Sequence, residues 1–473
     1  MQKEELNHEI SSKEQRALQI STIEGAADRV AFGFGHGFIT NFALALKANS
    51  FQIGVLSSLP NLLHQLIQPY SSRSMENLSR KKIVSRAALL EAILWIPMAI
   101  LGFLFWKGLI KSTAIYLAII VYALINLGRG SGYPVWFSWM GDIVPEKIRG
   151  GYFSKRNLII GIVEISAALI GIALINVFEK QGYLLIGLAI FFLISSIFKI
   201  LSYSLILKQY EPKFVLEKKE EFSFWDFIKR YDNFGKFAVY MGVFYFALMI
   251  ASPFFMVYMV NELKFSTAIS VGIMIMGSIF YLLFLPLVGK FSDKYGNLKL
   301  LYLANIAFAI APLTWMISKN PIILGLVPQL FIGIANAALT ISFTNFTYNA
   351  VSQKHRGLCA SYTNILIGIG SLIGSLAGGA ILNYVNLESL AVDIFFAVFI
   401  LSALLRASTA YYFLPKIQEK KFKRIPALSA NLTHPFKTIQ AEIGWIDEIS
   451  RSRYTEGLKI WENSKNYVLR KKI

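Results

Sequence analysis

The sequence of 473 residues contains a single cysteine, Cys359, and five histidines that are scattered along the chain. One cysteine excludes an intramolecular disulfide and a thiolate metal cluster, and the histidines show no paired metal spacing. No Walker-type phosphate-binding loop occurs anywhere in the chain. These absences argue against a resident metal or other cofactor, and against ATP hydrolysis by this chain.

Charged residues are also scarce, at 16% of the chain, and residues 1–19 contain no apolar segment of the kind that a secretory signal needs. Hydrophobic residues make up 55% of the chain, and the mean hydropathy is +0.52. The apolar residues come in blocks of about 20, the length that crosses a bilayer core of about 30 Å. We therefore predict an all-α polytopic membrane protein whose first span is its own insertion signal.

The apolar blocks predict twelve spans, arranged as two six-helix bundles. The predicted parts are an N-terminal segment at 1–22, the bundles at 23–207 and 236–414, a central loop at 208–235 and a basic tail at 415–473. The predicted spans are residues 24–46, 51–71, 84–106, 113–140, 157–178, 183–207, 236–260, 267–289, 298–318, 322–348, 360–384 and 390–414.

The distribution of positive charge predicts which way the chain crosses the membrane. Its net charge of +19 would suggest nucleic-acid binding in a soluble protein. However, the odd-numbered loops hold six Lys or Arg residues, against 24 in the even-numbered loops and the N-terminal segment together. This asymmetry follows the positive-inside rule. We expect a multi-pass protein of the cell membrane, with both termini cytoplasmic and no nucleic-acid partner.

A gapless internal repeat indicates that the two halves are copies of one unit. Residues 149–176 and 356–383 are identical at 11 of 28 positions, where chance gives about three in an apolar chain. Each copy begins with an Arg-Gly pair, at Arg149 and Arg356, and continues into an apolar segment with glycines in common. The repeat predicts two pseudo-symmetric bundles.

Two polar segments are predicted to lie on the membrane surface. In the central loop an apolar stripe at helical spacing stands beside Lys229 and Arg230, as in an interfacial helix. The tail is basic over 416–424 and shows apolar residues at helical spacing over 438–468, which predicts amphipathic helices near anionic lipid. The central-loop stripe consists of Phe222, Phe224, Trp225, Phe227, Ile228 and Tyr231.

The most specific motif is GKFSDKYGNLK, which follows the eighth predicted span. It matches the pattern G-x-x-x-D-[RK]-x-G with a later basic residue, through Gly289, Asp293, Lys294, Gly296 and Lys299. With the twelve spans, the duplication and the long central loop, residues 20–415 resemble the major facilitator superfamily. The resemblance implies a two-bundle transporter fold in which Asp293 acts in a latch, with a solvated turn as the alternative. We expect Gly289 to allow a close helix approach and Gly296 to permit a tight reversal.

The loops of the first half depart from this motif. In the loop between spans two and three, Pro69 replaces the first glycine and Arg73 replaces the aspartate. After span four, GDIVPEKIRG resembles the family's acidic, Pro-containing turn. We expect Asp142, Arg149 and Arg356 to take part in gating, the arginines by meeting carbonyls or carboxylates at helix ends. Anchoring of the topology explains the two arginines equally well.

Ionisable residues inside predicted spans are functional candidates, because a charge in the bilayer is costly. Arg129 lies nearest the midplane, where it would attract an anionic substrate or tune a carboxylate, with Glu164 or Asp28 titrating. A buried ion pair that fixes helix packing is an equal alternative. The second half has two such residues, Asp393 and Arg406, both in predicted span twelve. The first half has Asp28, Arg29, His36, His64, Glu91, Arg129, Glu164 and Lys199.

The second half offers a neutral polar stripe on predicted span ten. Asn336, Thr340 and Thr344 recur at four-residue steps, and Asn345 follows them. These residues are candidates for the wall of a substrate cavity, with hydrogen bonding between helices as the alternative. Further candidates for the same wall are Asn364, Tyr240, Tyr245 and Tyr258.

These features favour a secondary active transporter that moves a small solute by alternating access and works as a monomer. Proton coupling is a hypothesis that Asp28, Glu91 and Glu164 motivate. Two other classes stay open at this point: a non-transporting membrane sensor whose tail binds partners, and a membrane-embedded enzyme that processes lipid. The odd-numbered loops are short and poor in carboxylates, which disfavours the enzyme. The sequence fixes neither the substrate nor the direction of transport.

Overall fold

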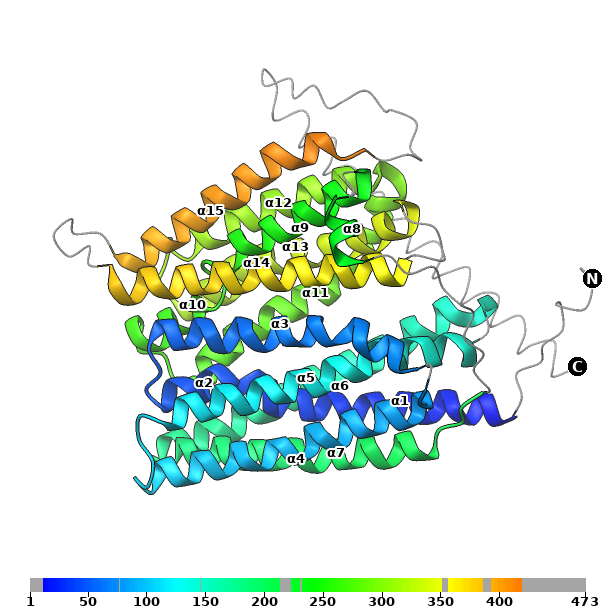
Figure 1. Cartoon of the computed structure of the whole chain (residues 1–473). Helices are drawn as coiled ribbons and strands as arrows, with labels where there is room; N and C mark the ends of the chain where they lie inside the picture. Colours follow the sequence, from blue (N-terminus) through cyan, green and yellow to red (C-terminus); the bar gives the residue numbers. More distant parts are fainter. Residues whose placement is uncertain are drawn as a thin grey trace, which may run out of the picture. The chain divides into compact units, whose positions relative to one another are not determined.

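The computed structural model describes residues 12–75, 77–144, 146–212, 223–229, 232–350, 356–385 and 393–418. Over these residues the chain forms long helices that run side by side (Figure 1). Successive long helices cross from one end of the molecule to the other. We call the end that carries Ser12 and Leu414 the termini end, and the opposite end the far end.

The first bundle begins with a helix that is interrupted once. α1 (Ser12–Gly35) passes through a short 3-10 turn, η1 (His36–Phe38), into α2 (Ile39–Ala45) at the far end. The remaining helices of this bundle are α3 (Ser50–Ser74), α4 (Arg80–Trp106), α5 (Ala114–Ile143), α6 (Glu146–Lys180) and α7 (Leu184–Lys208).

The second bundle also begins with an interrupted helix. α9 (Asn233–Met249) is followed by turns at 250–253, then by α10 (Phe254–Val257) and a π-helical segment, η2 (Tyr258–Glu262). Pro253 lies at the break, where its ring nitrogen has no hydrogen to donate. The remaining helices are α11 (Thr267–Tyr295), α12 (Asn297–Thr314), α13 (Pro321–Ala350), α14 (Arg356–Tyr384), α15 (Ile394–Phe413) and the short η4 (Leu414–Lys416).

Polar side chains begin several helices by accepting hydrogen bonds from the first backbone amides. Asn49 forms a capping box with Gln52 at the start of α3, and Ser79 and Ser266 cap α4 and α11. Asp393 caps α15, because its carboxylate accepts a hydrogen bond of 2.9 Å from the amide of Phe395. The prediction that Asp393 lies within a span is therefore wrong, since it marks the far-end start of the helix.

Ten of the described helices are long and apolar enough to cross a membrane. They correspond to predicted spans three to twelve. The first two predicted spans are helical as well, as α1 with α2 and as α3, although they are too polar to meet the same measure. The predicted twelve-helix, all-α architecture is confirmed.

Of the predicted interfacial helix in the central loop, the structure describes α8 (Phe224–Lys229). Trp225 is 69% exposed, whereas Phe227 is buried and its ring lies 5.4 Å from the ring of Tyr362 on α14. At its start the Ser223 hydroxyl donates to Asp226 over 2.6 Å, which holds the pKa of that carboxyl below its usual value. The predicted tail helices lie outside the described residues.

The repeated segments occupy equivalent places in the two bundles. α6 packs on α1 in its own bundle and on α11 across the interface, whereas α14 packs on α9 and crosses to α3. On α14, glycines at four-residue steps permit close helix contact, as small residues do in membranes. A Cβ added to Gly370, Gly374 or Gly378 would lie 2.0 to 2.1 Å from a carbonyl oxygen of the chain at α9.

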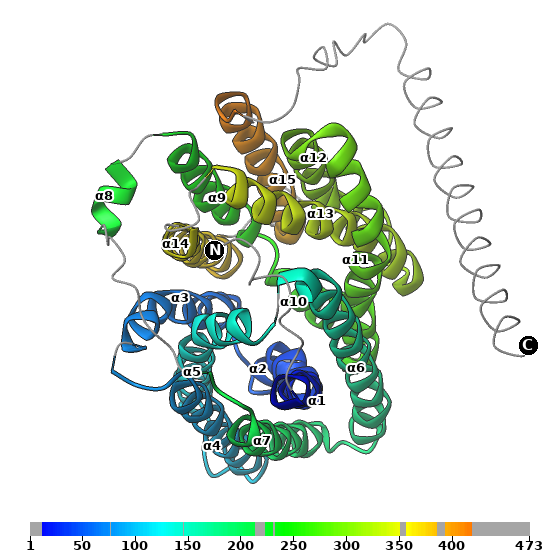
Figure 2. The same ribbon diagram turned by 90° about the vertical axis from the view of Figure 1, so that its right-hand side faces the viewer.

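The buried apolar side chains form three clusters, which lie at different positions along the length of the helices. One cluster joins both bundles at the far end, where Phe38 and Phe42 of the first bundle share it with Phe254 and Phe399 of the second. At the termini end each bundle has its own cluster, around Trp139 in the first bundle and around residues 237–244 in the second. Figure 2, which looks along the helices, shows the first bundle below and the second above.

Candidate functional site

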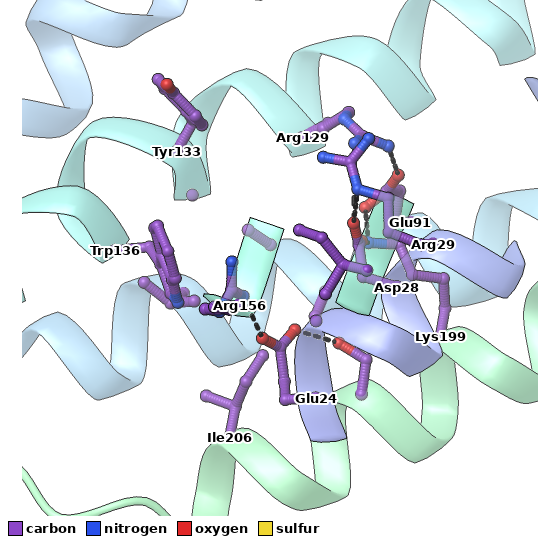
Figure 3. A pocket seen from close by; sticks show the side chains of 17 residues that line it. Glu24, Asp28, Arg29, Glu91, Arg129, Tyr133, Trp136, Arg156, Lys199 and Ile206 are labelled. Carbon is purple, nitrogen blue, oxygen red and sulfur yellow. Dashed lines mark hydrogen bonds and ion pairs between the residues drawn. The ribbon is translucent and has the colours of Figure 1, made fainter. Parts of the chain in front are cut away.

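A cavity of about 140 Å³ lies inside the first bundle, between α1, α4, α5, α6 and α7 (Figure 3). Val84, Ala87, Ala88 and other apolar residues make up part of its wall. Every residue of the wall comes from the first bundle, and the cavity is open to solvent beside the exposed Tyr133. Its charged residues are Glu24, Asp28, Arg29, Glu91, Arg129, Arg156 and Lys199.

Lys199 of α7 lies at the centre of this charged group. Its Nζ is 2.6 Å from Oδ1 of Asp28 on α1 and also forms an ion pair with Glu91 on α4. The Lys199 and Glu91 side chains are only 6% and 2% exposed. One ammonium therefore joins carboxylates from two other helices. The sequence placed Lys199 in a span, but nothing in the pattern indicated that it would bridge Asp28 and Glu91.

Arg129 reaches the same two carboxylates from α5. Its Nη2 is 3.6 Å from Asp28 Oδ2, and its Nη1 is 3.6 Å from Glu91 Oε1. The guanidinium also lies 3.4 Å from Nε2 of His36 and 4.7 Å from the centre of the Phe32 ring. Arg129 is thus a cavity arginine whose charge is already met by two carboxylates.

Arg29 and Glu164 form the most open pair in the group. Arg29 Nη1 lies 3.2 Å from Glu164 Oε2, and the two side chains are 29% and 33% exposed. Arg29 also approaches Asp28, at 3.9 Å between Nε and Oδ2. This pair connects the buried ions to the accessible surface of α1 and α6.

The charges of the cluster balance. Four carboxylates, on Glu24, Asp28, Glu91 and Glu164, pair with four cations, on Arg29, Arg129, Arg156 and Lys199. Charges in a low-dielectric interior are tolerated when they are paired, and removal of one partner leaves a costly unpaired charge. Addition of one proton to any of these carboxylates would therefore leave the cluster with a net positive charge.

Glu24 and Arg156 belong to the cluster although the sequence did not single them out. Arg156 Nη2 lies 3.7 Å from Glu24 Oε2, and the Ser202 hydroxyl donates to Glu24 Oε1 over 2.8 Å. A signal was available, since Glu24 and Asp28 are four residues apart and so share a helix face. Arg156 lies within α6, two turns after Arg149.

The loop motif between α11 and α12 is partly as predicted. Gly296 has φ +93°, a left-handed conformation that glycine adopts without strain, and the chain reverses there. The expectation for Gly289 is wrong, because an added Cβ would meet Ile341 at 3.6 Å, an ordinary contact. Lys299 places its ammonium 5.9 Å from the centre of the Tyr295 ring. The side chains of Asp293 and Lys294 lie outside the described residues.

Asn345 is partly buried and makes polar contacts at the turn between α11 and α12. Its Nδ2 donates to Asn297 Oδ1 over 2.9 Å, and the Ser292 hydroxyl donates to the same oxygen over 2.5 Å. Asn345 thus ties α13 to the turn between α11 and α12. The Asn336 amide donates to the carbonyl of Ile332 within its own helix.

Of the other candidate residues on the second bundle, some are exposed and others are buried. Asn336, Thr340 and Thr344 form an exposed stripe on α13, and Thr344 donates to the Thr340 carbonyl over 2.9 Å. Tyr240 and Tyr258 are 0% and 1% exposed, so their assignment to a cavity wall is wrong. Their rings pack in the apolar clusters of the second bundle and the far end.

Asp142 takes part in a cross-link at the termini end. Its Oδ2 lies 2.5 Å from Nη1 of Arg80, a fully buried side chain that also donates to the Ser138 carbonyl. The Glu211 carboxylate accepts a hydrogen bond of 2.7 Å from the backbone amide of Arg80. These contacts tie the end of α5 to the start of α4 and to the chain after α7.

Arg149 and Arg356 lie in the first turns of α6 and α14. Their side chains fall outside the described part of the structure, so the predicted contacts with carbonyls or carboxylates stay predictions. The helix positions themselves agree with the repeat, because each Arg-Gly pair lies near the start of the equivalent helix of its bundle.

Two pseudo-symmetric bundles of membrane-length helices, one of which encloses a charge-balanced cluster, define a polytopic membrane protein of the two-bundle class. The family model for the Major Facilitator Superfamily matches residues 30–280 and 237–452. The chain belongs to this family.

Individual relatives are similar over shorter stretches or at low identity. Vacuolar basic amino acid transporter 2 of Saccharomyces cerevisiae is 35% identical over 98 residues, which cover 21% of this chain and 20% of that protein. An uncharacterized transporter of Schizosaccharomyces pombe is 29% identical over 98 residues, or 17% of its length. These matches span about a fifth of the curated relatives or less, so their activities are not carried over.

Solved structures resemble the chain over most of its length. The nucleoside transporter NupG has a TM-score of 0.63 at 15% identity, covering 85% of this chain and all of that chain (100%). A bacterial homologue of the iron transporter ferroportin, in an inward-facing state, has a TM-score of 0.63 at 14% identity, covering 84% and 99%. At such identities the likeness establishes the fold alone.

Proposed function

We propose that this chain is a secondary active transporter that moves a small solute across the cell membrane by alternating access, with both termini in the cytoplasm. The observation that carries the proposal is where the apolar clusters lie along the length of the helices. One cluster seals the two bundles together at the far end, while each bundle keeps a separate cluster at the termini end. Rocking of rigid bundles about a shared interface is how two-repeat transporters expose a site to alternate sides. This conformation would be open toward the termini end.

The far-end closure is supported by polar contacts between the bundles. Glu179 of α6 accepts hydrogen bonds of 2.9 and 3.1 Å from the backbone amide of Thr267, at the start of α11. The Ser375 hydroxyl of α14 donates to the carbonyl of Gly54 on α3 over 2.8 Å. Within the described residues, the hydrogen bonds between bundles all lie in the far-end half of these helices.

We further propose that transport is coupled to protons through Asp28, Glu91 and Glu164. Each carboxylate pairs with a cation on a helix other than its own. Protonation of a carboxylate therefore weakens the attraction between those two helices. This supplies a physical link between proton binding and helix movement. The substrate class is open, because the similar proteins include a transporter of basic amino acids and one of nucleosides.

The first experiment identifies a ligand and measures its transport. The purified protein is screened by thermal shift against sugars, amino acids, nucleosides, organic anions and hydrophobic cations, since a ligand that binds the folded state raises the melting midpoint. Compounds that stabilise the protein are then tested for counterflow and for gradient-driven uptake in proteoliposomes. A reconstituted, monodisperse protein that supports neither with any stabilising ligand would refute the transporter proposal.

The coupling proposal has its own test. Asp28→Asn, Glu91→Gln and Glu164→Gln are combined and compared with the unmodified protein. We expect counterflow to persist and acceleration by an imposed pH gradient to disappear. Uptake that still follows the pH gradient in the triple variant, or that is indifferent to the gradient in the unmodified protein, would exclude these carboxylates as the coupling groups.

A further inference from the structure

The ion pairs of the first bundle form two groups. Arg156 and Glu24 pair with each other, at 3.7 Å between Nη2 and Oε2. In the second group three cations contact the carboxylates of Asp28 and Glu91, and Glu164 supplies a third negative charge. The three cations are Arg29, Arg129 and Lys199. Without the charge of Glu164, the second group would therefore carry one positive charge in excess.

Glu164 is the carboxylate of this group that is held least firmly. It accepts a hydrogen bond of 3.2 Å from Arg29, and its side chain is 33% exposed. Asp28, by contrast, contacts all three cations, and the Glu91 side chain is 2% exposed. An exposed ion pair contributes little to stability, whereas breaking a buried one is costly. Glu164 can therefore leave Arg29 while the inner pairs stay formed.

Arg29 and Arg129 converge on the wall of the cavity. Arg29 Nε lies 3.9 Å and Arg129 Nη2 lies 3.6 Å from the same oxygen, Oδ2 of Asp28. Both guanidinium groups also lie close to the Phe32 ring, with their central carbons 5.3 and 4.7 Å from its centre. Figure 3 shows the two side chains gathered beside Asp28 and Glu91. These contacts do not involve Glu164, so they keep the two guanidiniums together when Glu164 moves away.

The group that now occupies the outer side of Arg29 is itself a carboxylate. Glu164 shows that a carboxylate can approach Arg29 there to hydrogen-bond distance. A guanidinium binds carboxylates preferentially, because its planar donors match the two oxygens. The carboxylate of a solute could replace that of Glu164, provided that Glu164 has lost its charge. With both carboxylates ionised, the group would hold an unpaired negative charge.

We propose that the cavity binds a small monocarboxylate anion on Arg29 and Arg129, and that the anion binds together with one proton, which Glu164 takes. The charges of the anion and the proton cancel, so movement of the two together is electroneutral. The inference rests on the proposed function for the movement of the solute, whereas the binding site is a feature of the first bundle alone.

The groups around Glu164 are arranged for this exchange. Arg29 faces it from α1 with Asp28 beside it, and the charge of Arg129 on α5 also acts on it. From the second bundle, α11 approaches α6 one turn away through the apolar side chain of Leu282, 3.7 Å from a Cβ added to Gly161. A proton on Glu164 therefore leaves the excess positive charge on the two arginines.

The volume of the cavity limits the solute. It is about 140 Å³, well below the roughly 300–1,000 Å³ of pockets for drug-sized ligands. At about 30 Å³ for each water in the liquid, it holds about four or five groups of that size. Ala87, Ala88 and Gly132 give the wall a small apolar part. A carboxylate with a short apolar substituent fits these limits.

The charge of the ligand is tested with a series of matched size. Calorimetry on the purified protein compares lactate with lactamide, alanine and alaninamide, which are neutral, zwitterionic and cationic. Benzoate and benzamide form a larger pair. We expect each carboxylate to bind at least tenfold more tightly than its uncharged partner. Equal or tighter binding of an amide or of alanine would overturn the proposal, as would the absence of binding by both carboxylates.

The proton is counted in the same experiment. Titrations in buffers of different ionisation enthalpy should show about one proton taken up for each anion bound at neutral pH, because the two bind together. In Glu164→Gln the uptake should vanish, and lactate should bind at least tenfold more tightly, since this variant spends no free energy on protonating a carboxylate at neutral pH. A gain in affinity cannot arise from a damaged fold. Unchanged affinity and proton uptake in Glu164→Gln would contradict the role of Glu164.

Two further variants separate the arginine from a general effect of charge. Arg29→Gln combined with Glu164→Gln keeps the net charge of the unmodified protein, and it should bind lactate at least tenfold more weakly than Glu164→Gln alone. Asp226→Asn removes a carboxylate on the exposed α8 and should leave both affinity and proton uptake unchanged. Equal effects of Asp226→Asn and Glu164→Gln would show that overall charge, and not this site, sets the affinity.

Transport separates this inference from the proposed function. In proteoliposomes we expect an inward proton gradient to drive lactate uptake, and a potassium diffusion potential with valinomycin to leave the rate unchanged. A rate that follows the potential would contradict electroneutral movement of one anion with one proton. Anion binding with proton uptake but without transport would count against the proposed function alone. Transport of an uncharged solute by a protein that binds neither carboxylate would overturn this inference and leave the proposed function standing.

Discussion

At the residue scale, a buried arginine is not a site by its charge alone. Arg129 and Arg406 both lie within spans, and both were candidates by that criterion. Arg406 is 1% exposed and donates to the carbonyls of Phe308 and Leu248 over 2.7 and 3.0 Å. Pro312 lies four residues after Phe308 in α12 and has no amide hydrogen, so Arg406 donates to a carbonyl that lacks its usual helical donor. Arg129 instead contacts carboxylates that can gain a proton, which makes it part of the candidate site.

The central role of Lys199 leads to a stability prediction. Lys199→Met removes the cation that joins Asp28 to Glu91, and loss of one partner from a buried ion pair costs about 3–5 kcal/mol. We expect the free energy of unfolding in detergent to fall by that amount in chemical denaturation. Lys208→Met on the exposed end of the same helix is the control, with a change of about 0.5 kcal/mol or less. Equal effects of the two variants would show that Lys199 is not held by the cluster.

At the scale of the element, close helix packing is carried by glycines that the sequence could not tell apart. Gly289 belongs to the recognisable loop motif but has room for a methyl group. Gly374 belongs to no motif, yet an added Cβ would lie 2.1 Å from the carbonyl oxygen of Phe246. The backbone of the neighbouring helix cannot move as a side chain can, so the second glycine is the constrained one.

This difference predicts opposite outcomes for the same substitution. Gly374→Ala should destabilise the protein by about 1–3 kcal/mol through overpacking against α9. Gly289→Ala should be neutral or stabilising, since alanine favours a helix over glycine by about 1 kcal/mol. The two predictions are checked by comparing the thermal unfolding midpoint of each purified variant with that of the unmodified protein. A larger loss for Gly289→Ala would mean that α11 and α13 approach each other more closely than this structure shows.

At the scale of the whole molecule, the polar contact between Glu179 and Thr267 joins the two bundles where they are sealed. The carboxylate of Glu179 meets the amide and the hydroxyl at the start of α11, with oxygen distances of 2.9 to 3.2 Å. A negative charge at a helix N-terminus is favourable because the amides there carry partial positive charge. Opening of the far end would require this contact to break.

Cross-linking of this contact should therefore stop transport. Glu179→Cys with Thr267→Cys, on the Cys359→Ser background, is treated with a short bifunctional thiol reagent that a reductant can cleave. We expect solute uptake to fall to the background level and to return after reduction. The control pair Trp106→Cys with Tyr183→Cys lies at the far end of a single bundle, where the two rings are 6.3 Å apart. Normal uptake by the cross-linked inter-bundle pair would contradict alternating access through the far end.

The sequence by itself determined the helices, their number and the duplicated order of the halves. These features follow from local hydrophobicity, from charge distribution between spans and from a repeat that any alignment reveals, so no tertiary contact is needed to read them. The motif also predicted the reversal at Gly296, because φ +93° is a local property of the backbone. Asp28, Glu91 and Arg129 were found as candidates through the cost of placing charge in an apolar span.

Only the tertiary structure decided which of these charges meet and which glycines are constrained. Lys199 bridges Asp28 and Glu91 because three helices distant in sequence converge, and Arg156 reaches Glu24 where Gly25 leaves space beside it. Helical periodicity gives the face on which a side chain lies, but it carries no information on the rotation and height of the helix opposite. The pairing of buried charges, and with it the candidate site, is fixed by that packing.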